Sequence, residues 1–599
     1  MYGYCGKILR VNLAEKSVES YIPDEKDLRE FIGGAGLAVK LHYDMKTFEV
    51  EPLSSKNVLV LMTGPLTATK APSTSRLEFC ARSPLTAIWG ESNSGGKMAA
   101  YLKYCGWDGV IVEGASDKPV YLKVDVNGAE IVDAESLWGK GCYETQEEIE
   151  KDLGEKRVST AVIGPAGENL VKYACIQVDN SRHAGRTGMG AVMGSKKLKG
   201  IAVVYDPSER QKVEVADEDA FNKVVDEVME RIRDDFTCNM FTQLGTSGYM
   251  ETAEGFGDLP IKYYTQGMWD GATKISGAAM VASVLRGNDG CLGCVVRCGR
   301  VVEYRGREIH GPEYETLAAF GALQLNDNLE SLIEINYLVN DLGMDSISAG
   351  VSIAFAMYLA EKGVGDFDIK WGDAERVKDL LRDIAYRKGK GDELAEGVRF
   401  IGRKYGVESL AAQVKGLEIP MHDARAFASL AAAYATHPRG ACHLPHQMYL
   451  YEMGKTIKEY DIKSDDRFSS EGKGILTAKV QNFSELFNSV TMCAFMPVKP
   501  RHIAEMLRAV TGYSYTIENI YTAGERIFTL KRIYNLKCGV TARDDTLPEI
   551  VLQPLEGGSA GNVPDVKKQV TELYEFRKWP EGIPSKEKLE ELGLGWVEL

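Results

Sequence analysis

The strongest constraint in the sequence is a group of three closely spaced cysteines, Cys291, Cys294 and Cys298. Their C-x₂-C-x₃-C spacing is compact enough for each thiolate to hold one corner of an iron–sulfur cube. The alternatives are a zinc site, which also opens with C-x₂-C, and structural or free thiols. The third thiol, only four residues after the second, favours the cube. A cube needs a fourth ligand from elsewhere in the chain, and an electron-transfer centre predicts a second redox site that it serves.

The composition is that of an ordinary globular protein. The 599 residues allow roughly three or four domains, and 44% are hydrophobic and 26% charged. No apolar run is long enough to span a bilayer, and the N-terminus lacks an apolar signal core, so we expect a cytoplasmic protein without a membrane span. The net charge of −15 argues against a nucleic-acid partner. Twelve cysteines without an export signal predict reduced thiols and metal ligands, not disulfides.

The hydrophobic patterns predict an α+β, multidomain protein. Residues 1–210 contain short apolar runs cut by Gly, Pro and Asn, which is typical of strands and tight turns. Residues 211–415 contain stretches with helical periodicity, such as 217–234 and 329–342, and helical character continues over residues 416–599. We therefore expect a β-rich N-terminal domain followed by two mainly α-helical domains with these boundaries.

Two glycine-dense stretches, residues 83–96 and 182–197, occur in the first of these regions. Glycines let a backbone approach a ligand closely, and successive N–H groups can then face anionic oxygens. Arg76, Arg182 and Arg186 could clamp phosphates bidentately. The second stretch has neither a P-loop nor a dinucleotide-binding pattern, and tight turns in a β-rich domain are the alternative for either stretch. Two such loops with arginines favour a large, multiply charged cofactor.

Further short motifs lie in a fixed order along the chain. They are Gly64-Pro-Leu-Thr, Ser83-Pro-Leu-Thr, Asn93-Ser-Gly-Gly, residues 185–196, the cysteine triplet, Gly311-Pro-Glu-Tyr-Glu-Thr, Asp341-Leu-Gly-Met-Asp, Lys415-Gly-Leu-Glu-Ile-Pro and Arg439-Gly-Ala-Cys-His. In this combination and order the chain resembles the tungsten-containing aldehyde ferredoxin oxidoreductase family over essentially its whole length. Each motif alone is only moderately specific.

The resemblance implies a bis-pyranopterin cofactor carrying tungsten, one [4Fe–4S] cluster and a bridging Mg²⁺. Because pterin dithiolenes bind the heavy metal in this family, the sequence does not distinguish tungsten from molybdenum. The first domain would be the base on which the two pterins lie, and the helical domains would close over it. The implied cofactor-binding residues are Arg76, Asn93, Gly95, Arg182, His183, Gly185, Arg186, Asp341, Gly343, Asp345, Asn488 and Met492. Asn93 and the backbone carbonyl of His183 would hold Mg²⁺, which prefers oxygen ligands.

The resemblance places the fourth cluster ligand at Cys493. The family has a D-x-x-G-L-C block there, and this chain carries Asn488 and Thr491 at the Asp and Gly positions. The alternative is a cysteine that only packs in a helix. The remaining cysteines lie singly, and we expect most of them to be small buried residues: Cys5, Cys80, Cys105, Cys142, Cys175, Cys238, Cys442 and Cys538.

Candidate acid–base residues lie in two of the motifs. Glu313 and Glu315 match the catalytic glutamate block of the family, and an extended backbone would put both on one face. The sequence does not tell which of them is catalytic. His443 matches the family's active-site histidine, and His437 and His446 flank it as further pocket candidates. A helix-start glutamate and a structural histidine are the alternatives without the family context.

Pro445, together with Asn488 and Thr491, points to an atypical branch of the family. Pro445, which has no charge and no N–H donor, occupies a position where the family usually has Lys or Arg. No histidine lies between His310 and His422, so we do not expect the iron site that bridges subunits in some members.

The resemblance implies an enzyme that oxidises aldehydes to carboxylic acids. Electrons would pass through the cluster to ferredoxin or a ferredoxin-like subunit, and family habit suggests a homodimer or a hetero-oligomer. One alternative is a relative that acts on another low-potential substrate, such as an aromatic acyl-CoA. The other is a non-catalytic electron-relay subunit, and the presence of Glu313, Glu315 and His443 speaks against it.

Overall fold

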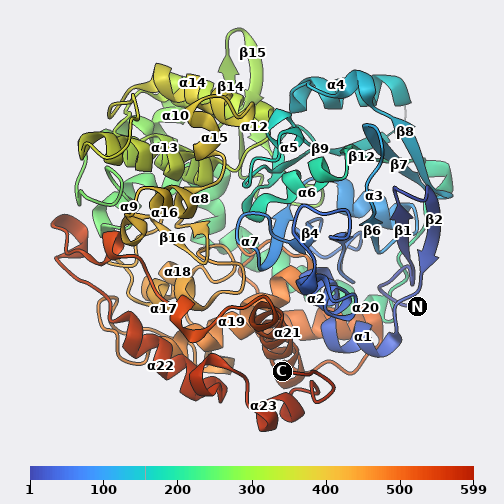
Figure 1. Ribbon diagram of the computed structural model, residues 1–599. Helices are drawn as coiled ribbons and strands as arrows, with labels where there is room; N and C mark the ends of the chain where they lie inside the picture. The colour runs from blue at the N-terminus through green and yellow to red at the C-terminus, as the bar shows by residue number, and fades with distance from the viewer. Residues whose placement is uncertain (155–156) are drawn as a thin grey trace.

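A computed structural model describes residues 1–154 and 157–599. Within them, the first third of the chain forms two six-stranded sheets, seen at the right of Figure 1. The first sheet has the order β2-β1-β6-β3-β4-β5 and is antiparallel except between β1 and β6. Its strands are β1 (Ile8–Asn12), β2 (Ser17–Tyr21), β3 (Leu59–Met62), β4 (Leu77–Arg82), β5 (Trp89–Ser94) and β6 (Gly109–Glu113).

The second sheet has the order β11-β10-β9-β12-β7-β8. The pair β7–β12 is parallel, and the other pairs are antiparallel. Its strands are β7 (Val120–Asp125), β8 (Gly128–Asp133), β9 (Arg157–Val162), β10 (Ile176–Val178), β11 (Arg182–Ala184) and β12 (Leu198–Tyr205). The expected β-rich N-terminal part of an α+β protein is thus confirmed.

Two short helices lie in the apolar core between the sheets. They are α3 (Met98–Tyr104) and α6 (Met189–Ser195), whose Met98, Leu102 and Val192 pack in one core with residues of both sheets. The remaining helices of this part are α1 (Glu25–Phe31), α2 (Gly34–Asp44), α4 (Cys142–Leu153) and α5 (Pro165–Glu168). Because both sheets share this core, they form one base.

The two glycine-dense stretches are not loops over their whole length. Each contains a regular element, β5 in the first and α6 in the second. A Cβ atom on Gly190 would clash with the carbonyl of Cys175, and one on Gly194 would clash with the carbonyl of Gly167. These glycines of α6 therefore let the helix pack directly on neighbouring backbone, a use of glycine that the sequence does not distinguish from anion binding.

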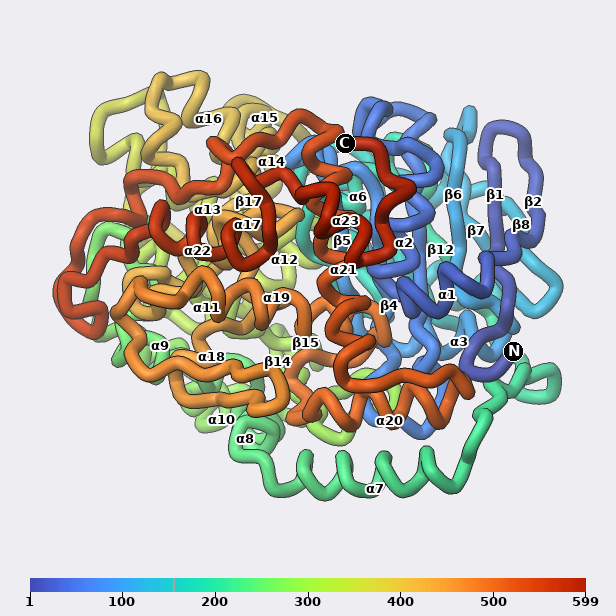
Figure 2. The backbone as a smooth tube through the Cα atoms, turned by 90° about the horizontal axis from the view of Figure 1, so that it is seen from below, coloured from blue at the N-terminus to red at the C-terminus, as the bar shows by residue number. Residues whose placement is uncertain are grey.

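The rest of the chain is mainly helical, as predicted, and lies at the left and bottom of Figure 1. The expected helix over 217–234 is α7, which begins after the N-cap Asp217 and runs along the lower edge of Figure 2. The middle helices are α7 (Glu218–Asp234), α8 (Phe236–Leu244), α9 (Met250–Phe256), α10 (Gly277–Ser283), α11 (Tyr314–Phe320), α12 (Leu329–Leu342), α13 (Ser346–Glu361), α14 (Ala374–Ala385), α15 (Lys390–Leu394) and α16 (Val398–Lys404).

The last third adds a short hairpin and further helices. The hairpin is β16 (Gln413–Val414) with β17 (Leu417–Glu418), and the helices are α17 (Ser429–Thr436), α18 (Met448–Glu452), α19 (Lys473–Val490), α20 (Pro500–Thr511), α21 (Ile517–Lys537), α22 (Val566–Arg577) and α23 (Lys586–Glu591). One large apolar core joins helices of both helical regions, α13 and α19 among them. Ile527 and Ile533 of α21 pack against Val60 and Trp89 of the first sheet, so the end of the chain returns to the base.

The cysteine triplet lies in a small sheet of its own. This sheet consists of β13 (Leu285–Asp289), β14 (Gly299–Tyr304) and β15 (Arg307–His310) in that order, and the triplet occupies the loop between β13 and β14. The β14–β15 hairpin projects at the top of Figure 1. Because β13 and β14 pair antiparallel, they hold the two ends of the cysteine loop together.

Replacing Gly194 by Ala tests the backbone contact of α6. The added methyl group must displace the Gly167 carbonyl, so we expect a loss of about 1–3 kcal/mol in the free energy of unfolding. Gly255→Ala in α9 is the matched control, because a Cβ there meets no atom within 4 Å, and its helix propensity predicts a gain of up to about 1 kcal/mol. Denaturant unfolding of both variants measures this, and a Gly194→Ala protein as stable as the parent would contradict the packing argument.

Candidate active site

Ser73 brings the two cysteine-bearing segments together. Its N–H donates to the carbonyl of Gly293 at 3.2 Å, inside the triplet loop, and its own carbonyl accepts the N–H of Cys493 at 2.9 Å. Cys493 follows α19, more than 190 residues after the triplet in the sequence. The structure thus brings the predicted fourth ligand next to the three thiols in space.

Two buried arginines lie beside these thiols. Arg76 donates to Cys493 Sγ at 3.5 Å, and Arg182 pairs with Asp289 at 3.0 Å. Burial by itself lowers the pKa of both guanidinium groups, but negative charge on the neighbouring cysteines outweighs it and raises the pKa. Burial, followed by the charge of Glu313, also raises the pKa of Cys298. The two arginines therefore favour an anionic group at the thiols, whereas burial and Glu313 oppose ionisation of Cys298 itself.

The strand β5 places Asn93 and Gly95 at the same point. Asn93 accepts a hydrogen bond from Arg76 and donates one to the carboxylate of Glu78. Burial and then the charge of Glu91 raise the pKa of Glu78 to about 8. A Cβ on Gly95 would clash with Cys291 Sγ. The segment that follows β5 thus lies directly against the triplet, and a side chain at Gly95 would have to displace the Cys291 thiol.

The second glycine-dense stretch connects the base to the helical region. His183 lies on β11, 3.3 Å from the amide of Gln177, and burial, with Arg182 next, lowers its pKa to about 3. Arg186 pairs with Asp345 at 3.0 Å and donates to the carbonyl of Glu418 at 2.6 Å. A Cβ on the adjacent Gly185 would approach Asp345 as well, at 3.9 Å.

The Asp341–Asp345 block lies where α12 ends and α13 begins. The Asp341 carboxylate accepts the N–H of Tyr143 at 3.1 Å, and Gly343 ends α12 in the left-handed conformation with φ 78°. The side chain of Asp345 caps α13 by accepting from the N–H of Ile347. Burial raises the pKa of both aspartates.

The block before Cys493 keeps a left-handed residue where the family has glycine. Thr491 has φ 55° and ψ 38° at the end of α19, and its hydroxyl lies 2.8 Å from that of Thr67. Asn488 is in the last turn of α19, and Met492 is buried with its N–H bonded to Phe487 at 2.9 Å. A β-branched residue with positive φ is strained, so the fold imposes this turn even without glycine.

Glu313 and Glu315 do not share a face. The sequence expectation assumed an extended backbone, but α11 begins at Tyr314, with Glu313 as the residue before it and Glu315 in its first turn. Glu313 accepts a hydrogen bond from the Thr246 hydroxyl. Glu315 contacts different side chains, those of His422 and His443. The two carboxylates therefore have separate partners.

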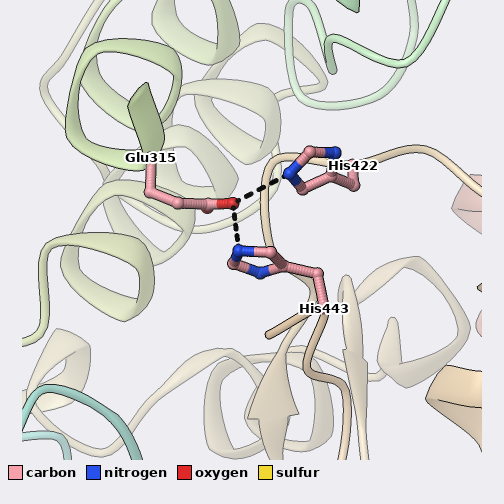
Figure 3. Close-up of side chains that lie close together, drawn as sticks. All are labelled: Glu315, His422 and His443. Carbon is pink, nitrogen blue, oxygen red and sulfur yellow. Dashed lines mark ion pairs between the residues drawn. The ribbon is translucent and has the colours of Figure 1, made fainter. Parts of the chain in front are cut away.

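Glu315 meets two histidines, as Figure 3 shows. Its Oε1 lies 3.3 Å from His443 Nε2 and 3.6 Å from His422 Nε2, and its Oε2 accepts the N–H of Met421 at 2.9 Å. Burial raises the pKa of Glu315, partly opposed by the charge of His422. Burial, followed by the charges of His422 and Arg186, holds the pKa of His443 well below its usual range, so His443 is neutral.

His422 and its partner Asp258 were not among the site residues predicted from the sequence. His422 Nδ1 lies 2.6 Å from Asp258 Oδ2. Burial lowers the pKa of His422, but Asp258 more than offsets this and raises it. The sequence contains one signal for this histidine, because it lies two residues after the Lys415–Pro420 motif, whereas Asp258 lies in no motif.

His437 and His446 belong to a second buried group, not to the Glu315 pair. The two rings lie 4.7 Å apart, and His437 has a ligand atom within 4.8 Å of those of Glu91 and Glu485. Lys531 joins these two carboxylates at 2.6 Å each. Burial lowers the pKa of both histidines, so a neutral imidazole borders an ion-paired lysine.

The donors around this site suit an anionic cofactor. Among the described residues, Arg76 Nε and Arg186 Nη1 are buried without a hydrogen-bond partner, which is costly unless a ligand supplies an acceptor. The triplet loop and Cys493 both bond to Ser73, and thiols are the ligand type that iron–sulfur clusters use. No helix in the part of the chain that the structure describes is long and apolar enough to cross a bilayer.

Comparisons with known proteins cover nearly the whole chain. Residues 8–205 match the N-terminal domain of aldehyde ferredoxin oxidoreductase, and residues 223–594 match its domains 2 and 3. The tungsten-containing aldehyde ferredoxin oxidoreductase of Pyrococcus furiosus is 39% identical over 610 residues, and that of Thermococcus kodakarensis is 38% identical over 612 residues. Each alignment covers 99% of both proteins.

A solved structure agrees with the fold. The active-site complex BamBC of benzoyl coenzyme A reductase, bound to 1,5-dienoyl-CoA, matches with a TM-score of 0.86 and covers 99% of this chain and 98% of that one. At 24% identity this likeness concerns the fold alone. The resemblance predicted from the sequence motifs is confirmed: both family matches and the two close relatives show that this chain belongs to the aldehyde ferredoxin oxidoreductase family of oxidoreductases.

Proposed function

We propose that this chain oxidises aldehydes to carboxylic acids on a tungsten or molybdenum bis-pyranopterin and passes the electrons through a [4Fe–4S] cluster to ferredoxin or a ferredoxin-like subunit. The observation that carries the proposal is the buried pair in which Glu315 Oε1 lies 3.3 Å from His443 Nε2. Family membership and the relatives' tungsten-dependent aldehyde chemistry support the substrate class.

The overall reaction is RCHO + H₂O → RCOOH + 2H⁺ + 2e⁻. When bound, the pterin-held metal would supply the acceptor for the electron pair. Glu315 would act as the general base that takes a proton from the attacking water, and burial raises its pKa towards the range useful for this. Neutral His443 can offer its ring N–H to the aldehyde oxygen. Glu313, hydrogen-bonded to Thr246, would not take part directly.

The cluster would be held by Cys291, Cys294, Cys298 and Cys493, which the contacts of Ser73 gather. Arg76 and Arg182 would help to hold the pterin phosphates, since both are next to the thiols and their positive charge suits phosphate. Asn93 and the carbonyl of His183 would hold Mg²⁺. The further pterin contacts would come from Gly95, Gly185, Arg186, Asp341, Gly343, Asp345, Asn488 and Met492.

Metal analysis tests the cluster. We expect anaerobically purified protein to contain about four irons and one tungsten or molybdenum per chain. Cys294→Ala should lose the iron while circular dichroism still reports a folded base. Cys105→Ala is the control, because this buried thiol contacts the carbonyl of Val204 in the base and should leave the iron content unchanged. Zinc in place of iron at the triplet would refute the cluster assignment.

Substrate assays test the reaction class. We expect the metal-loaded protein to reduce a viologen dye with members of a panel of aliphatic and aromatic aldehydes. An aromatic acyl-CoA with reduced viologen is the comparison substrate for the runner-up function. Fully loaded protein that reduces no dye with any aldehyde would defeat the proposal, and turnover of neither substrate class would favour an electron-relay subunit.

Substitutions of the two glutamates test the choice of base. Glu315→Gln removes the carboxylate beside His443, so we expect kcat/KM with aldehydes to fall by about 10²–10⁴-fold at unchanged metal content. Glu313→Gln is the matched control two residues away, and we expect it to lose less than about tenfold, because Gln can still accept from Thr246. The reverse ranking of the two variants would make Glu313 the base.

A further inference from the structure

Asp258, His422 and Glu315 form a continuous line of buried polar groups. The imidazole bonds through Nδ1 to Asp258 at 2.6 Å and faces Glu315 with Nε2 at 3.6 Å. His422 is only 2% exposed. Figure 3 shows His422 and His443 approaching the same carboxylate oxygen from different segments. Solvent therefore cannot replace either contact.

The surroundings hold this line in one orientation. Tyr449 stacks on the His422 ring, with ring centres 4.3 Å apart and planes 6° apart, and the Tyr434 hydroxyl donates to the His422 carbonyl at 2.9 Å. Asp258 accepts from the Tyr249 hydroxyl and from the N–H of Asp423, each at 3.0 Å. The ring can neither flip nor tilt without losing these partners.

The charges around His422 favour its protonated form. The titratable and charged groups that bear on His422 and Glu315 are Asp258, Asp345, Arg186, His443, Tyr249, Tyr314, Tyr434 and Tyr449. Burial lowers the pKa of His422, and the carboxylates of Asp258 and Glu315 together reverse this. An imidazolium between two carboxylates is the arrangement that best balances charge at this position.

We propose that Asp258 and His422 are a positioning pair that keeps the Glu315 carboxylate ionised and aimed at the same point as His443. This inference rests on the proposed aldehyde oxidation. In the reaction, the proton of the attacking water moves to Glu315, while His422 keeps its proton throughout. Asp258 acts on Glu315 only through the imidazolium, so neither residue of the pair touches the substrate.

The expected effect on pH dependence follows from the charges. With Asp258→Asn, the buried imidazole no longer has its strongest stabilising charge and becomes neutral near pH 7. Glu315 then loses the His422 charge that opposes the effect of burial, so its pKa rises further. Glu315 is then ionised only at higher pH. The acid limb of the pH profile, where kcat/KM rises with pH, therefore moves to higher pH.

The experiment measures kcat/KM for an aldehyde with viologen as acceptor between pH 5 and about pH 9, on metal-loaded protein. We expect Asp258→Asn and His422→Gln to move the acid limb upward by about one pH unit or more, which is about a tenfold loss on that limb, with recovery at high pH. Asp545→Asn is the matched control. That carboxylate is also buried and pairs with Lys415 and Arg532, and its loss should lower heat stability without moving the limb.

A second measurement does not depend on activity. A histidine whose pKa is raised by folding stabilises the fold below its unfolded pKa of about 6.5, and this contribution disappears as pH rises through the folded pKa. The Tm difference between the parent protein and His422→Gln should therefore be largest below pH 6 and narrow at high pH. A Tm difference between the two proteins that does not change with pH would refute the proposal that His422 is protonated in the folded protein.

The outcomes separate this inference from the proposed function. Aldehyde activity in the parent protein with an unmoved acid limb in both variants would overturn the positioning pair. A fully loaded parent protein without aldehyde activity would overturn the proposed function, and the Tm measurement would then still decide whether His422 is an imidazolium held by Asp258.

Discussion

The hydrogen bonds of Ser73 join three parts of the molecule at one point. Its N–H binds the triplet loop and its carbonyl binds Cys493, so a residue of the base holds segments from both helical regions. Ser73 adopts a left-handed conformation with φ 59°, which costs free energy in a residue other than glycine. The thiols, Arg76 and the strand β5 all depend on this junction for their mutual position.

Buried charge is the second constraint. Arg76 and Arg186 enter the interior with guanidinium atoms that lack partners among the described residues, whereas the buried carboxylates of Glu91 in the base and Glu485 in α19 are paired with Lys531. Such groups cost stability unless they are paired. A polyanionic cofactor would supply the missing partners, and its binding would then stabilise the closure of the helical regions over the base by mass action.

The sequence predicted the secondary structure well where a single helix or strand accounts for the spacing of the apolar residues. The helix over 329–342 follows directly from its periodicity and ends at Gly343, as α12 does. For the glycine-dense stretches the sequence predicted loops, but each contains a regular element. Glycine serves a ligand-binding loop and a close helix contact equally well, so only the neighbouring backbone shows which glycines make a close contact. Likewise, the start of α11 at Tyr314 separates Glu313 from Glu315, and a two-residue spacing cannot reveal where a helix begins.

The sequence by itself determined the class of fold, the family and the donor types: three thiols at cluster spacing, arginines beside glycine-dense stretches, and glutamates and a histidine in ordered motifs. Tertiary structure alone decided which of these side chains meet. Asp258 and His422 are 164 residues apart in the chain, and nothing in the local sequence of either residue indicates that it contacts the other. Periodicity and spacing report on neighbours along one element, whereas a 2.6 Å contact between distant segments depends on how all the elements between them pack.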